Sequence, residues 1–284
     1  MKNWIKKIAF GIERQCYQHG LRSHGALTLP HFLGLGPGQS GTTWLAHHLA
    51  AHPDVFVVPV KETYYFSQRL HELSLHDYAA LFGPGENQIR GEITPGYSIL
   101  TRNRIALIRN LMPDVRLLLT LRNPIERSWS AARRVMPKLG TTIDVISDEQ
   151  LFDYLRLEWA YRPPNGVALH GDYEPGLLEG RYNRTLDNWL SIFPAEQLLV
   201  IFFDDICSKP AEVLARVCEH IGADPAFHWD TGSLETAVNK NPPHPMPDRV
   251  RQFLQTQYRP ELEALAQRVG GHAQTWLDAL NKNA

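Results

Sequence analysis

The feature that most constrains the fold is a glycine-rich turn between an apolar run and an amphipathic segment. Residues 31–36 (HFLGLG) form a short apolar run that predicts a buried strand. Residues 37–41 (PGQSG) predict a tight loop, and residues 42–51 place apolar side chains on one face, which predicts a helix ending before Pro53. A strand, a glycine loop and a helix in direct succession favour an α/β fold with parallel strands.

Three further apolar runs predict buried strands. They are residues 55–58, 116–121 and 197–203. Each is short and lacks the alternation of a half-exposed strand, which is typical of a sheet covered on both faces. Asp204 and Asp205 follow the last run, and we interpret them as its polar end.

Helical patterns separate these runs. They lie at residues 124–136, 210–221 and 250–269. Pro124 suits the first turn of its helix, Gly222 closes the second, and Pro260 is expected to break the third into two pieces. The alternation predicts a single α/β domain with a central parallel sheet of about five strands, flanked by helices on both faces.

Composition excludes several classes of protein. The 284 residues are enough for one large domain, and a net charge of −1 argues against a nucleic-acid partner. The three cysteines are too scattered for a disulfide framework or a zinc site, and they suit a reducing compartment such as the cytoplasm. The histidines show no ligand spacing, so we expect no metal.

The N-terminus is distinct from the rest of the chain. Residues 1–24 are expected to form an amphipathic helix, ahead of a main domain at residues 31–284. Lysines alternate there with Trp4 and isoleucines, so the helix either docks on the domain or contacts a membrane peripherally through residues 1–18. No run of 18 apolar residues predicts a membrane span, and nothing indicates the oligomeric state.

The glycine loop has the composition of a phosphate-binding loop. Residues 36–43 (GPGQSGTT) allow the backbone to curl so that its N–H groups and the helix N-terminus face an anion. A loop that hydrolyses nucleoside triphosphates needs a Lys where this chain has Thr42, so that activity is disfavoured. The alternative is a purely structural turn.

A second anion site is predicted after the 116–121 strand. Arg122 falls at its carboxyl end, and Ser130 lies eight positions later in the following helix. An arginine at this position forms a bidentate phosphate clamp, and a serine adds a neutral donor. Two such sites at the carboxyl ends of parallel strands are expected to meet at one sheet edge, where these folds bind ligands.

Taken together, these motifs resemble those of the sulfotransferases that use 3′-phosphoadenosine 5′-phosphosulfate (PAPS), in the bacterial and Golgi-type glycan branch. The loop before Gly41 is similar to the family's 5′-phosphosulfate loop, and residues 121–130 (LRNPIERSWS) are similar to its 3′-phosphate motif. Residues 61–66 (KETYYF) resemble its Lys-Glu-x-x-x-Phe segment. Further similarity lies at residues 91–97 (GEITPGY), 180–182 (GRY), 189–190 and 197–203.

The resemblance implies a P-loop-like sulfotransferase fold and a role for each matching residue. PAPS would be the co-substrate and 3′-phosphoadenosine 5′-phosphate (PAP) the product, without a metal. The 5′-phosphate and sulfate would be held by Ser40, Gly41, Thr42 and Thr43. The 3′-phosphate would be held by Arg122 and Ser130, with Tyr182 beside the nucleotide. Glu62 would be the base that takes the acceptor proton.

The chain departs from the family at Gln39, where the family usually has a lysine beside the leaving phosphate. Gln39 can donate a hydrogen bond but carries no charge. Lys61, expected at the end of the adjoining strand, is the candidate replacement and a second catalytic residue. Lys240 either belongs to a loop that closes over the 3′-phosphate or lies in a flexible linker.

The predicted function is transfer of a sulfuryl group from PAPS to an acceptor hydroxyl, with a glycan or glycolipid as the first choice. One alternative is a nucleotide or small-molecule kinase of related fold, against which Thr42 argues. Another is a non-catalytic protein that binds PAP or PAPS, which Gln39 and the N-terminal helix motivate. The sequence does not name the acceptor.

Overall fold

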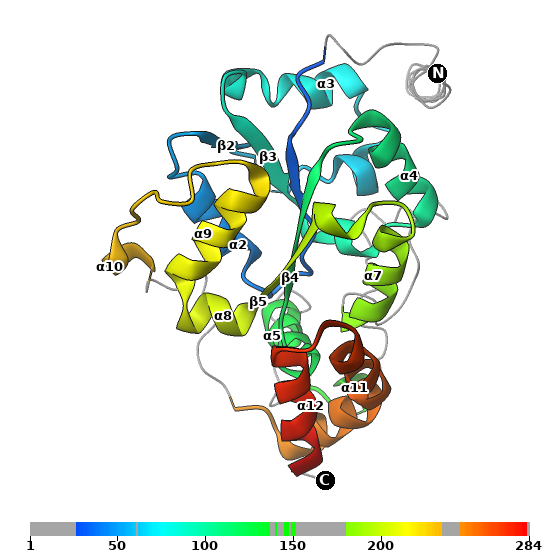
Figure 1. Cartoon of the computed structure of the whole chain (residues 1–284). Helices are drawn as coiled ribbons and strands as arrows, with labels where there is room; N and C mark the ends of the chain where they lie inside the picture. Colours follow the sequence, from blue (N-terminus) through cyan, green and yellow to red (C-terminus); the bar gives the residue numbers. More distant parts are fainter. Residues whose placement is uncertain are drawn as a thin grey trace, which may run out of the picture.

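The computed structural model describes residues 27–60, 62–136, 140, 145–147, 149–151, 180–234 and 245–282. Within them, five strands form one parallel sheet in the order β2-β3-β1-β4-β5 (Figure 1). The strands are β1 (Phe32–Gly34), β2 (Val55–Val57), β3 (Ile89–Ile93), β4 (Arg116–Leu121) and β5 (Leu198–Phe202). The predicted α/β class and parallel sheet are confirmed, and β3 is a strand for which the apolar pattern made no prediction.

Helices cover both faces of the sheet (Figure 1). On one face, Phe32 and Leu118 pack in a core with α2 (Thr42–Leu49) and α9 (Pro210–Ile221). On the other face, Leu33 and Leu117 pack with α4 (Arg102–Leu111) and α7 (Tyr182–Leu190). Successive strand residues point to opposite faces, so strands that are apolar throughout need a helical layer on each side.

The remaining elements are shorter or lie at the carboxyl edge of the sheet. The helices are α3 (Leu75–Ala80), α5 (Pro124–Val135), α8 (Phe203–Ser208), α10 (Thr231–Leu234), α11 (Asp248–Val269) and α12 (His272–Lys282). A π-helical turn, η1 (Tyr65–Arg69), and 3₁₀ turns, η2 (Gly83–Gly85), η3 (Pro95–Ile99) and η6 (Ala195–Gln197), complete the described chain. Among the described residues, no helix combines the length and apolar character needed to cross a membrane.

Pro260 does not divide α11, so the prediction of two pieces is wrong. The helix runs unbroken from Asp248 to Val269 with Pro260 inside it. Proline removes one hydrogen bond from the helix interior and costs about 3 kcal/mol. Here the buried side chains continue on both sides of the proline, with Leu254 before it and Leu262 after it, and their packing on the core offsets that cost.

Asp204 and Asp205 are not the polar end of a strand, which corrects a second prediction. β5 ends at Phe202, and both aspartates lie in the first turn of α8. Carboxylates are stabilised there by the positive end of the helix dipole. The change matters for the site because α8 places Phe203 beside the glycine loop.

Candidate active site

The glycine loop joins β1 to α2 and is shaped by its neighbours. Gly41 is the N-cap of α2 with φ 89°, a left-handed conformation that favours glycine. A Cβ at Gly41 would lie 2.9 Å from Ile206 Cδ1, and a Cβ at Gly36 would lie 1.7 Å from Thr120 Oγ1. The loop therefore fits between β4 and α8 only with glycines at these positions, and the predicted strand, loop and helix are confirmed.

The loop presents a buried hydroxyl that has no hydrogen-bond partner among the described residues. Ser40 is fully buried, and its Oγ has no hydrogen-bond partner among the described residues. Thr42 and Thr43 form the first turn of α2, whose N-terminus has no side-chain cap and no acidic residue. Buried polar groups are normally paired, and an uncapped helix N-terminus attracts negative charge. The loop thus has the chemistry of an anion site.

Gln39 ties the loop to the second predicted anion site. Arg122, directly after β4, donates from Nη1 to the Gln39 carbonyl at 3.1 Å. Ser130, on α5, donates from Oγ to Gln39 Oε1 at 3.1 Å. Because β1 and β4 are adjacent parallel strands, their carboxyl ends bring the two motifs together, as the sequence analysis expects.

Arg122 is a half-buried cation. Burial lowers the pKa of Arg122, while the nearby Glu126 carboxylate acts in the opposite direction. Its guanidinium carbon lies 4.7 Å from the centre of the Phe203 ring. Tyr182, at the start of α7, donates its hydroxyl to the Arg122 carbonyl at 2.6 Å. Arg122 remains charged at neutral pH, and a phosphate would relieve its loss of hydration.

Glu62 lies on the far side of the same sheet edge. It follows β2, and β3 separates β2 from β1, so the expectation that the two strands adjoin is wrong. Its backbone is left-handed, with φ 61°, and its Oε2 accepts a hydrogen bond from the Tyr64 hydroxyl. The residue is half-buried.

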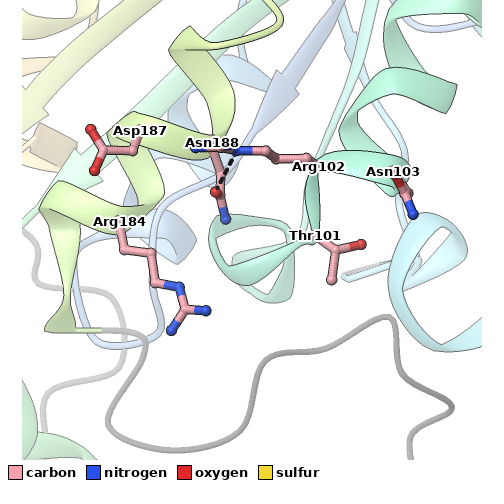
Figure 2. Close-up of a pocket in the computed structure, with 6 residues that line it drawn as sticks. All are labelled: Thr101, Arg102, Asn103, Arg184, Asp187 and Asn188. Atoms are coloured by element: carbon pink, nitrogen blue, oxygen red, sulfur yellow. Dashed lines mark hydrogen bonds between the residues drawn. The ribbon is translucent and has the colours of Figure 1, made fainter.

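A cavity of about 430 Å³ opens between α4 and α7 (Figure 2). It is lined by Thr101, Arg102, Asn103, Arg184, Asp187 and Asn188. Arg102 donates from Nε to Asn188 Oδ1 at 3.2 Å, which fixes one arginine at the wall. Arg184 extends from α7 toward the start of α4 (Figure 2), and Asp187 is paired with Arg268 at 2.5 Å.

Residues 29–240 match the family described as the sulfotransferase domain. The chain belongs to that family. A crystal structure of a sulfotransferase from Alicyclobacillus acidocaldarius has the same fold, with a TM-score of 0.68 and 22% identity, over 87% of this chain and 98% of that one. The fold and the family resemblance drawn from the motifs are therefore confirmed.

The curated relatives of this sulfotransferase-domain chain include heparan sulfate sulfotransferases. Mouse heparan sulfate glucosamine 3-O-sulfotransferase 6 is 28% identical over 257 residues, covering 83% of this chain and 70% of that protein. Mouse heparan sulfate glucosamine 3-O-sulfotransferase 3A1 is 29% identical over 203 residues, covering 71% of this chain and 48% of that protein. The Dictyostelium discoideum membrane-associated sulfotransferase kil1 is 24% identical over 314 residues, covering 84% of this chain and 65% of that protein.

The structure leaves some predicted residues of this sulfotransferase-domain chain untested. Lys61, Lys240 and the N-terminal helix at residues 1–24 lie outside the described residues. Phe203 and the two cavity arginines were missed by sequence reasoning. Phe203 was missed because its helix was interpreted as a strand end, and the arginines because they are 82 positions apart and carry no motif.

Proposed function

We propose that this chain transfers the sulfuryl group of PAPS to a hydroxyl of a carbohydrate acceptor. The observation that carries the proposal is the contact of one residue, Gln39, with both Arg122 and Ser130. It links a loop with one partnerless buried hydroxyl, that of Ser40, to a half-buried cation across two adjacent strands. Such a pair of anion sites suits a nucleotide with phosphates at two positions, and family membership supports this choice of donor.

The described residues fit the two ends of the donor. The partnerless Ser40 hydroxyl and the uncapped start of α2 suit the 5′-phosphosulfate. Arg122 and Ser130 suit the 3′-phosphate, one as a charged clamp and the other as a neutral donor. Tyr182 stands beside them through its bond to the Arg122 carbonyl. The Ser130 hydroxyl donates to Gln39 Oε1, so it would turn from Gln39 to the 3′-phosphate when the nucleotide binds.

In the proposed reaction, the acceptor oxygen forms a bond to sulfur while the bond from sulfur to the bridging phosphate oxygen breaks. Glu62 takes the acceptor proton, and PAP leaves with the electron pair of the broken bond. Gln39 supplies a neutral contact where a cation normally stabilises the leaving oxygen. Lys61 is the candidate cation, although it follows β2, which β3 separates from β1.

The cavity between α4 and α7 is the candidate acceptor site. α7 begins at Tyr182, beside the donor site. α4 contacts η1, which follows residues 62–64, called here the Glu62 segment. Arg102 and Arg184 line the cavity and suit carboxylate or sulfate groups, so an anionic carbohydrate is the favoured acceptor. The heparan sulfate enzymes among the relatives support this class.

Two measurements test the proposal. Calorimetry should show PAP binding, with ATP and Mg²⁺ binding much more weakly, and a radiolabelled PAPS assay should show transfer to an anionic oligosaccharide. Equal affinity for ATP and PAP would favour a kinase and overturn the donor assignment. PAP binding without transfer to any glycan would favour the alternative that Gln39 motivates, a nucleotide-binding protein without transferase activity.

A further inference from the structure

A buried glutamate lies beside the segment that carries the proposed base. Glu92 is next to last in β3, between β2 and β1, and its residue is 1% exposed. It belongs to the 91–97 motif, to which the proposed reaction gives no role. A buried carboxylate is costly unless it is fully hydrogen-bonded, so its partners indicate why it is there.

Four hydroxyl groups donate to the Glu92 carboxylate. Oε2 accepts from Thr63 Oγ1 at 2.5 Å and from Thr94 Oγ1 at 2.8 Å. Oε1 accepts from the Tyr78 hydroxyl at 2.6 Å and the Tyr97 hydroxyl at 2.9 Å. An ionised carboxylate has about four lone-pair positions, so these donors satisfy it completely. The carboxylate is thus the centre of a network that reaches β3, α3, η3 and the Glu62 segment.

The Glu62 segment needs such support because its backbone is strained. Glu62 and Tyr64 are both left-handed, with φ of 61° and 53°, although neither is glycine. Thr63 lies between them and is 1% exposed. Its Oγ1 also accepts from Tyr65 N at 3.3 Å, and the Tyr97 hydroxyl accepts from Phe66 N at 3.3 Å. Strained residues persist where the surrounding contacts hold them, often at functional sites.

We propose that Glu92 is a positioning residue for sulfuryl transfer, holding Thr63 and Tyr97 so that Glu62 faces the acceptor. The inference rests on the proposed function, in which Glu62 takes the proton. Glu92 itself is buried away from solvent. Its carboxylate fixes Thr63, and the backbone on either side of Thr63 then fixes the direction of Glu62 and Tyr64. A displacement of about 1 Å at a reacting group can cost about 100-fold in rate.

The test compares two substitutions that each remove one donor from the same carboxylate. Thr63→Val removes the hydroxyl on the Glu62 side and keeps the side-chain shape. Tyr78→Phe removes the hydroxyl on the α3 side and keeps the ring that stacks on Tyr65 at 4.2 Å. Thr63→Ser keeps the donor and is the rescue variant. Glu92→Gln tests the carboxylate directly. If that protein does not fold, Thr63→Val and Tyr78→Phe test the inference in its place.

Two readouts are measured on the full chain: kinetics with PAPS and an anionic oligosaccharide, and backbone amide exchange. Thr63→Val should lower kcat at least tenfold, with PAP affinity within twofold of the wild type. Tyr78→Phe should stay within threefold in kcat, and Thr63→Ser should restore most of the loss. Equal losses in Thr63→Val and Tyr78→Phe, or no loss in Thr63→Val, would overturn the inference.

Amide exchange separates failure of this inference from failure of the proposed function. If the wild type transfers no sulfuryl group, the proposed function fails, and the exchange data alone decide whether Glu92 holds the segment. Thr63→Val should then speed exchange at Phe66 at least fivefold, since the Phe66 amide donates to Tyr97 and not to Thr63, and Tyr78→Phe should not. Unchanged exchange in Thr63→Val would remove the holding role, whatever the activity.

Discussion

The donor side and the base side of the candidate site are built in different ways. On the donor side, Arg122, Ser130 and the glycine loop come from adjacent strands and meet at Gln39. On the base side, Glu62 is held by a strained segment that is tied to a buried carboxylate on the next strand. One side depends on backbone turns and a cation, and the other on hydroxyl groups arranged around an anion.

This difference predicts that substitutions on the donor side change nucleotide affinity and that substitutions on the base side change turnover. In the proposed function, donor-side contacts act on phosphates that are charged before and after transfer, so their loss should weaken nucleotide affinity. Base-side contacts set the position of one carboxylate, so their loss should lower turnover and leave nucleotide affinity intact. Substitutions on the two sides should therefore have separable effects, and each experiment below either breaks or sharpens that separation.

The largest effect is expected from Glu62→Gln. The amide keeps the size of the side chain and cannot take a proton, and a general base contributes about 10²–10⁴-fold to the rate. Turnover should fall by that factor, with the PAP dissociation constant within twofold of the wild type. The control is Glu72→Gln, which removes a charge from an exposed position later in the same region of the sequence. It should leave turnover unchanged. Full turnover in Glu62→Gln would place the proton transfer on another group.

A somewhat smaller effect is expected from Lys61→Ala. If Lys61 stabilises the leaving oxygen in place of the family's lysine, its loss costs about 2.7–4 kcal/mol, or about 10²–10³-fold in kcat. The effect on PAP affinity should be smaller than that on turnover. Gln39→Lys in the Lys61→Ala background should restore part of the rate. Normal turnover in Lys61→Ala would reject the compensation, because an exposed ion pair is worth only about 0–1 kcal/mol.

Arg122→Ala tests the donor side. Hydrogen bonds to charged groups contribute about 1.5–3 kcal/mol, so PAP affinity should fall about 10- to 150-fold. The matched control is Arg116→Ala. Arg116 begins β4 at the opposite sheet edge, and its Nη1 donates to the Glu196 carbonyl at 3.2 Å. Calorimetry should give normal PAP affinity for the control, and equal losses in both variants would mean that the 3′-phosphate site is misplaced.

The two sides also differ in how far the sequence predicts them. Arg122 and Ser130 are eight residues apart and follow an apolar strand, so local spacing predicts their elements, and the rule that parallel sheets bind ligands at the carboxyl edge places them at the same edge as the glycine loop. The base-side network joins Thr63, in the segment after β2, to Glu92 on β3. Their pairing depends on β3 lying between β2 and β1, and strand order is not encoded in local periodicity.

Single positions also show that the local sequence does not determine the structure by itself. A proline such as Pro260 is expected to end a helix when only the local sequence is considered. Packing of the side chains on both sides of it keeps α11 continuous. Asp204 and Asp205 suit a strand end and a helix start equally well, and the structure shows the helix. The cavity arginines, Arg102 and Arg184, come from helices that meet only in the folded chain. In each case a long-range contact decides between local alternatives.

The smallest effect is a pH dependence of stability that comes from Glu92. Burial raises the pKa of Glu92 above its usual 4.5, and the four hydroxyl hydrogen bonds act in the opposite direction. As pH rises from below 4.5, the unfolded glutamate loses its proton before the folded one does. The free energy of unfolding should therefore fall through that window, by at most about 1.4 kcal/mol per pH unit, and level off above the folded pKa.

Comparison with Glu92→Gln isolates this contribution, because glutamine does not titrate and the other carboxylates are common to both proteins. Tyr78 and Tyr97 stay protonated throughout, since burial, joined by the Glu92 charge, raises the pKa of each phenol. Urea unfolding of both proteins between pH 4 and 8 should give a stability difference, wild type minus variant, that decreases with pH. A difference that increases with pH would mean that the hydroxyl hydrogen bonds outweigh burial, so that Glu92 is an anion at every pH where the protein is folded.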